Sequence, residues 1–227
     1  MKRSSKSRLT EKQMAEFPGD TVFDKIARAV CRAGTLPVKE LYEAWETARR
    51  IRRKFRGGRV MDLAGGHGLL AHILLVLDDN SKEALVVDVN VPKNAGQLSE
   101  AIIQAWPRLM GRIHYIEAPI ADIEIRPDDL VASVHACGTL TDTVLKLAVA
   151  ARARVAVLPC CHDLTLSDTG GLEGWVSGPL DVDVMRAVWL RQQGYTVITR
   201  TIPADITPKN RLLMGHPEEY KKMKLFC

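Results

Sequence analysis

The sequence predicts an α/β fold in which a mostly parallel sheet is covered by helices on both faces. Short apolar runs of strand length alternate with longer stretches of helical periodicity from about residue 59 onward. A glycine-rich turn joins the first of these strands to the first helix, an arrangement typical of α/β proteins that bind a ligand where a strand ends. With 227 residues, 46% of them apolar and 26% charged, the chain can form one soluble domain with a terminal extension.

The first 56 residues are expected to precede the α/β domain as an extension. Residues 1–19 carry basic residues among serines and end at a Pro-Gly pair, which favours a flexible basic arm. Apolar residues recur at helical spacing over 21–32 and 38–55, with a glycine and a proline between the two stretches. We therefore divide the chain into an arm at 1–19, a helical extension at 20–56 and the α/β domain at 57–227.

Seven strands and four helices are expected in the α/β domain. The first five strand candidates are residues 59–63, 84–89, 113–116, 130–135 and 155–158. Helices are expected over 69–77, 92–106 and 141–151, and a fourth over 182–193 after a glycine-rich loop. Residues 195–202 and 210–214 are expected to form a final antiparallel pair. Strands that alternate with helices predict a sheet that is buried on both faces.

The turn after the first strand, Asp62-Leu63-Ala64-Gly65-Gly66-His67-Gly68, is expected to bind a cofactor. Glycines at this point allow a sharp turn and let a ligand approach the backbone closely. The pattern alone fits two cofactor classes, because the segment from Gly66 to Ala71 also matches the dinucleotide pattern G-x-G-x-x-A. Asp88 lies 20 positions after Gly68, where a ribose-binding acid belongs in either class.

The charge of the turn separates the two cofactor classes. Asp62 ends the strand directly before the glycines, and its carboxylate would repel a pyrophosphate bound at the start of the helix. S-adenosylmethionine carries no phosphate, and its sulfonium and ammonium groups are positive. A carboxylate at the turn is favourable for that ligand, so we expect S-adenosylmethionine rather than a dinucleotide.

The segment from Val60 to Ala71 resembles the first motif of class I, Rossmann-like, S-adenosylmethionine-dependent methyltransferases. Val86-Val87-Asp88 resembles the second motif, whose acid holds the ribose hydroxyls. The resemblance implies a seven-stranded sheet with its last strand antiparallel, which agrees with the elements expected from the sequence pattern. It also implies the cofactor-binding residues, which are Asp62, Ala64, Gly65, Gly66, Gly68, Asp88 and, beside the adenine, Ile120.

Cysteine and histidine residues follow the fourth and fifth strand candidates, in the segments His135 to Asp142 and Pro159 to His162. Parallel strands end at the same edge of a sheet, so these side chains should gather near the transferable methyl group. The two segments resemble a narrower methyltransferase branch that includes acceptor-stem tRNA 2′-O-methyltransferases. The zinc module that precedes the core of those tRNA enzymes has no counterpart in this sequence.

Four interpretations are open for this group, whose candidate catalytic residues are His135, Cys137, Cys160 and His162. The favoured one is a polar pocket that orients the acceptor and supplies a base from one of the histidines. A covalent thiolate mechanism needs one activated cysteine, and small buried side chains that close the sheet edge need none. Zinc is disfavoured because Cys160 and Cys161 are adjacent and the usual C-x₂₋₄-C spacing is missing, so we expect no metal.

Seven of the eleven residues from Arg49 to Arg59 are basic and none is acidic. Such a cluster is typical of a surface that binds phosphate-rich partners, although a solvated helix face would look the same. We expect the partner to be RNA, either tRNA or rRNA. The segment Pro37 to Glu43 resembles a Lys/Glu segment in the same relatives, and the candidate substrate-binding residues are Lys39, Arg49, Arg52, Arg53 and Arg56. The alternatives are a protein or small-molecule methyltransferase, or a cofactor-binding module without catalysis.

The cysteine count and the apolar runs favour a cytoplasmic protein. Five cysteines form no obvious disulfide framework, which suits a reducing compartment. No apolar segment follows the basic start of the chain, so we expect no secretory signal. No run approaches the roughly 20 apolar residues of a membrane span, and we expect no membrane partner.

Overall fold

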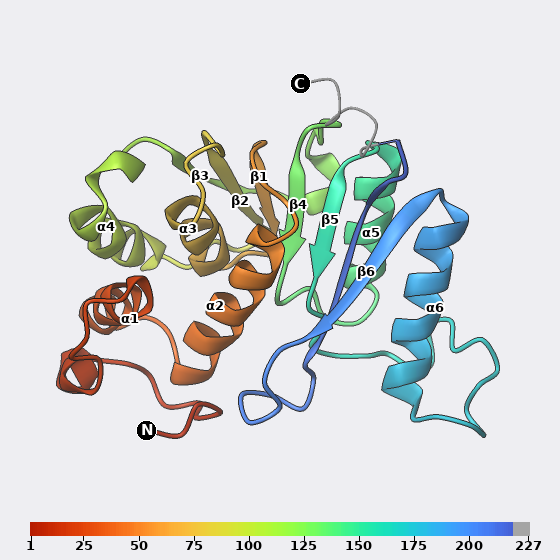
Figure 1. The fold of residues 1–227 in the computed structure, drawn as a ribbon, viewed down its shortest axis with the longest axis horizontal. Helices are drawn as coiled ribbons and strands as arrows, with labels where there is room; N and C mark the ends of the chain where they lie inside the picture. Colours follow the sequence, from red (N-terminus) through yellow and green to blue (C-terminus); the bar gives the residue numbers. More distant parts are fainter. Residues whose placement is uncertain (220–227) are drawn as a thin grey trace.

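The computed structural model describes residues 1–219, which form one seven-stranded mixed sheet in the order β3-β2-β1-β4-β5-β7-β6 (Figure 1). Strands β1 to β5 are parallel, and β7 runs antiparallel to both of its neighbours. This sheet confirms the predicted Rossmann-like fold. The strands are β1 Val60–Leu63, β2 Ala84–Asp88, β3 Ile113–Glu117, β4 Leu130–Ser133, β5 Arg154–Val157, β6 Tyr195–Thr201 and β7 Arg211–Pro217.

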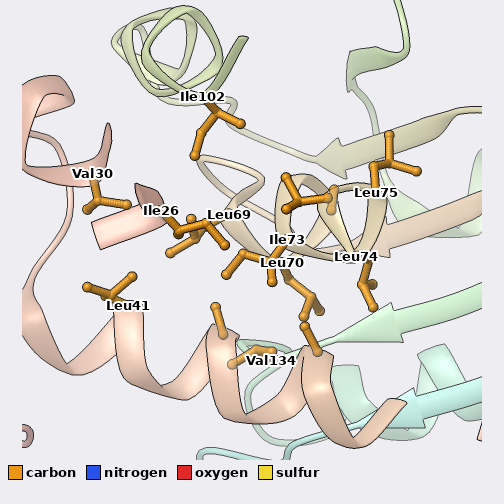
Figure 2. Packing of buried hydrophobic residues seen from close by; sticks show 14 of the residues in the cluster. Ile26, Val30, Leu41, Leu69, Leu70, Ile73, Leu74, Leu75, Ile102 and Val134 are labelled. Atoms are coloured by element: carbon orange, nitrogen blue, oxygen red, sulfur yellow. The ribbon is translucent and has the colours of Figure 1, made fainter. Parts of the chain in front are cut away.

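Helices cover the sheet on both faces because successive residues of each buried strand point to opposite sides. Val60 packs with the cluster that holds α1 to α4, whereas Met61 packs with the cluster that holds α5 and α6. Figure 2 shows the first cluster, where Ile26 lies beside Leu69 and Leu41 belongs to the same core. The helices are α1 Val22–Ala33, α2 Val38–Arg52, α3 Leu69–Val76, α4 Ala95–Ala105, α5 Leu140–Ala150 and α6 Gly178–Gln192.

The N-terminal segment is part of this core, which differs from the separate extension and flexible arm that we expected. Leu9 is fully buried and Phe17 is 3% exposed. The Leu9 backbone N–H donates to the carbonyl of Leu36 at 2.9 Å, and residues 11–16 form a short 3-10 helix. Leu9 and Phe17 stand among polar and charged residues, so the sequence pattern did not indicate that they are buried. Burying each of them stabilises the packed segment by about 1.5–3 kcal/mol.

The element bounds differ from the predictions mainly at the ends of helices. Helix α2 ends at Arg52 rather than near residue 55, and α6 begins at Gly178, before the expected residue 182. The end of the predicted domain at 227 lies outside the described residues. Within residues 1–219, none of the helices combines the length and the apolar character needed to cross a membrane.

Candidate cofactor and acceptor site

A cleft of about 330 Å³ opens at the carboxyl edge of the parallel strands. It lies where β1, β2 and β4 end and where α2 and α3 begin. Its walls are Leu36, Glu40, Ala44, Asp62, Ala64, Gly65, Gly66, His67, Leu69, Leu70, Asp88, Val134, His135 and Leu140. Of the expected cofactor residues, Gly68 and Ile120 are not part of this wall. Ile120 is buried in the cluster under α5 and α6.

The glycine turn leaves bare backbone on the cleft. A Cβ atom at Gly68 would come within 2.7 Å of the Val86 side chain, and one at Gly65 within 2.9 Å of Asp62. These glycines are required by the close packing of the turn on β2. Gly66 differs, because it has a φ of +51° and a Cβ added there would meet nothing within 4 Å. Its amide donates to the Asp88 carboxylate at 3.0 Å, so the turn and the acid form one unit.

Asp62 places a buried carboxyl group beneath this turn. Its Oδ2 accepts a hydrogen bond from the Ala71 amide in the first turn of α3, at 3.0 Å. Burial raises the pKa of Asp62 to about 7, and the charge of Asp88 adds to the increase. A positive ligand group would favour the ionised carboxylate, whereas a phosphate would oppose it. The carboxyl groups of Asp62 and Asp88 and the open backbone at Gly66 therefore fit S-adenosylmethionine.

We expect cofactor affinity to depend on pH through Asp62. Above pH 7 the carboxyl group is already ionised, but below pH 7 a cationic ligand must displace its proton. The affinity should therefore fall by about tenfold in total as the pH drops from 8 to 6. Calorimetry in buffers of different ionisation enthalpy would show the released proton. Asp62→Asn should remove this dependence, and an equal slope in the variant would contradict the assignment.

Three cysteines meet beside the cleft, at the ends of β4 and β5. The Sγ atoms of Cys137 and Cys160 are 2.8 Å apart, and the Sγ atoms of all three lie within 4.8 Å of one another. Lys209 Nζ donates to Cys161 Sγ at 3.4 Å. Burial raises the pKa of Cys160, while hydrogen bonds from Cys137 and then Lys209 lower the pKa of Cys161. Lys209 comes from the β6–β7 loop, and nothing in the sequence linked it to the cysteines.

The two candidate histidines have different surroundings in the structure. His135 is exposed and lines the cleft, as a base for the acceptor would need. His162 is not part of the cleft wall. Its side chain is 2% exposed, and its Nε2 lies 2.8 Å from the Asp183 carboxylate. Asp183 is held in turn by Arg211 at 2.6 Å. The carboxylate and the arginine hold its ring inside the protein, and a catalytic role for His162 stays a prediction.

The basic cluster is not the continuous binding surface that we expected. Arg52 is buried, forms an ion pair with Asp78 at 3.1 Å and donates to the Leu74 carbonyl at 3.0 Å. Arg49 and Arg50 both pair with Glu46 one turn earlier. The helical pattern of this segment could not reveal the ion pair of Arg52, because Asp78 is far away in the sequence.

The position of the cluster also differs from the expectation. Helix α2 begins at the cleft and its C-terminus leads into the start of β1, at the opposite edge of the sheet (Figure 1). Arg53 and Arg56 are exposed there, away from the cofactor turn. Lys39 lies at the cleft end of α2, where its ammonium pairs with the buried Glu43.

Comparison with known proteins gives the family. Residues 37–167 match the family described as a methyltransferase domain. A Drosophila pseudoobscura pseudoobscura protein, named a glutathione S-transferase C-terminal domain-containing protein homolog, is 28% identical over 200 residues, which cover 70% of this chain and 33% of that protein. This chain thus spans about one third of the fly protein.

Solved structures share the fold. An O-methyltransferase family protein from Burkholderia thailandensis has a TM-score of 0.51 and 20% identity, covering 94% of this chain and 65% of its own. TrmK of M. capricolum, solved with S-adenosylhomocysteine, has a TM-score of 0.50 and 13% identity, covering 75% of this chain and 67% of its own.

The family match covers more than half of the chain, so the chain belongs to this family of methyltransferase domains. Together with the seven-stranded sheet, the family identifies the class as the S-adenosylmethionine-dependent methyltransferases of class I. S-adenosylmethionine is the methyl donor of that class, in agreement with the charge at the glycine turn.

Proposed function

We propose that this chain transfers the methyl group of S-adenosylmethionine to RNA, either tRNA or rRNA. The observation that carries the proposal is a basic N-terminal segment that lies beside the mouth of the cofactor cleft. The likeness of the segments His135 to Asp142 and Pro159 to His162 to the acceptor-stem tRNA 2′-O-methyltransferases supports the same class of substrate.

The cleft residues have separate tasks in this proposal. Gly66 leaves room for the cofactor, and Asp88 accepts hydrogen bonds from its ribose hydroxyls. Asp62 stabilises the positive charge of the donor. The sulfonium of the cofactor supplies the reactive methyl group, and the protein accelerates transfer mainly by holding the acceptor in line with it. His135 faces the cleft and can take up the proton that an oxygen or nitrogen acceptor loses.

The N-terminal segment is anchored at the start of α2. Backbone amides of Val38 and Lys39 donate to the carbonyls of Ser7 and Ser5, at 3.0 and 2.9 Å. Leu36, which precedes α2, lines the cleft, so the segment lies at the cleft edge of the sheet (Figure 1). Lys2, Lys6 and Arg8 are exposed on it. These charges provide the phosphate contacts that we first assigned to the cluster at Arg49 to Arg59.

Charge reversal of Lys6 and Arg8 tests the RNA surface. Lys6→Glu with Arg8→Glu should weaken RNA binding and reduce the salt slope of log K by about two, because each lost phosphate contact releases about one counterion less. Fluorescence anisotropy with bulk tRNA over a series of salt concentrations measures both quantities. The matched control is Arg53→Glu with Lys54→Glu, two exposed residues at the opposite edge, which should bind RNA like the wild type.

Two results would redirect the proposal. Equal losses in both double variants would indicate unspecific charge attraction, and salt-insensitive or absent RNA binding would favour a protein or small-molecule acceptor. Mass spectrometry of nucleosides from cells with and without the gene tests the substrate directly. One methylated nucleoside should be missing from the tRNA or rRNA of the deletion cells.

A further inference from the structure

We propose that Cys137, Cys160 and Cys161 form a zinc site with three thiolate ligands at the rim of the cofactor cleft. The proposal concerns the metal alone and is independent of which acceptor the enzyme methylates. It also replaces the expectation of no metal, which rested on ligand spacing within one segment. The structure supplies the ligands from two segments, with one cysteine after β4 and two after β5.

The distances suit one metal ion. Tetrahedral zinc with Zn–S bonds of about 2.3 Å holds its sulfur atoms about 3.8 Å apart. The three Sγ atoms here lie within 4.8 Å of one another, and the pair Cys137–Cys160 is 2.8 Å apart. Side-chain movements of about 1 Å therefore bring all three to ligand distance. The backbone already holds the two segments together, because the Gly138 amide donates to the Cys161 carbonyl at 3.0 Å.

The surrounding charge is also suitable. Zinc binding displaces the three thiol protons to solvent, and the resulting Zn²⁺ centre with three thiolates carries a net charge of −1. Lys209, whose Nζ is 3.4 Å from Cys161 Sγ, supplies the compensating positive charge. Sulfur ligands select zinc and other soft metals over magnesium or calcium.

The fourth position of the metal is open. Among the described residues, no further histidine, aspartate, glutamate or cysteine joins the group of three. Three protein ligands and one free position are typical of catalytic zinc, whereas structural zinc has four protein ligands. Cys137 and Cys161 are exposed, and Cys137 lies in the chain between His135 and Leu140, two residues of the cleft wall. The free position can thus take a water molecule or an acceptor atom.

Metal analysis of the purified chain tests the site. Protein dialysed against micromolar zinc and then against metal-free buffer should retain about one zinc per chain. Cys137→Ser, Cys160→Ser and Cys161→Ser should each lose most of it. Cys31→Ala is the matched control, because this buried cysteine belongs to α1, and it should retain the metal. Lys209→Ala should weaken zinc binding by roughly two- to fivefold, the range of an exposed ion pair.

A spectroscopic measurement on the wild type keeps the test independent of variant folding. Cobalt added in place of zinc should give the intense thiolate-to-metal charge-transfer band in the near ultraviolet, and zinc should abolish it. Absence of that band, or zinc retained by the triple serine variant, would overturn the proposal. So would a Cys137–Cys160 pair that resists alkylation until reduced and binds no zinc after reduction, since the cluster would then be a redox disulfide.

Discussion

Replacing Arg52 by alanine is expected to lower the free energy of unfolding by about 3 kcal/mol. Removing one partner of a buried ion pair leaves the other charge uncompensated, which costs about 3–5 kcal/mol. The side chains of Arg52 and Asp78 are each 2% exposed, and their charged atoms are 3.1 Å apart. The expected loss is at the lower end because Asp78 also accepts the Gly57 amide at 2.7 Å and lies 3.6 Å from Arg56.

Chemical denaturation of the variant against the wild type measures this loss. Arg53→Ala is the matched control, since Arg53 follows directly in the chain but is exposed, and it should change stability by less than about 0.5 kcal/mol. Equal stabilities of the two variants would mean that Arg52 does not join α2 to the end of α3. The pair matters for interpreting RNA experiments, because reversing Arg52 would destabilise the domain rather than probe a binding surface.

The sheet and the cofactor turn could be predicted because their determinants are local in the sequence. Buried parallel strands are continuous apolar runs, and a sharp turn with close packing requires glycine at fixed positions, as at Gly65 and Gly68. The charge of Asp62, which lies at the end of β1 close to those glycines, indicated the cofactor class. The order of the strands then brought the cysteines after β4 and β5 to one edge.

The features that the sequence could not reveal depend on partners far apart in the chain. Arg52 and His162 were interpreted from their own segments, but Asp78 and Asp183 fix them inside the protein. Leu9 and Phe17 are isolated apolar residues in a polar segment, and only the packed structure shows the surface they bury. Lys209 reaches Cys161 from the β6–β7 loop. The spacing of apolar residues shows which face of a helix or strand is buried. It does not show which charged side chains from other parts of the chain contact that element.

The largest functional effect is expected from Gly66→Arg, which should abolish S-adenosylmethionine binding. A side chain at Gly66 would project into the open space of the cleft, since no atom lies within 4 Å of the added Cβ. The arginine would also place a positive group where the cationic donor binds. We expect the affinity to fall by at least about 100-fold, or about 2.7 kcal/mol, while the fold is retained.

The matched control for backbone strain is Gly111→Arg. Gly111 has a φ of +71°, similar to the +51° of Gly66, and a Cβ there also meets nothing within 4 Å. Both substitutions carry the cost of a left-handed backbone, about 1–2 kcal/mol, but Gly111 lies in the turn before β3, at the edge opposite the cleft. Calorimetry should show normal cofactor affinity for Gly111→Arg and none for Gly66→Arg, with similar losses of thermal stability. If both variants bound the cofactor like the wild type, the cleft beside Gly66 would not be its site. If both lost binding, strain rather than occupation of the cleft would be the cause.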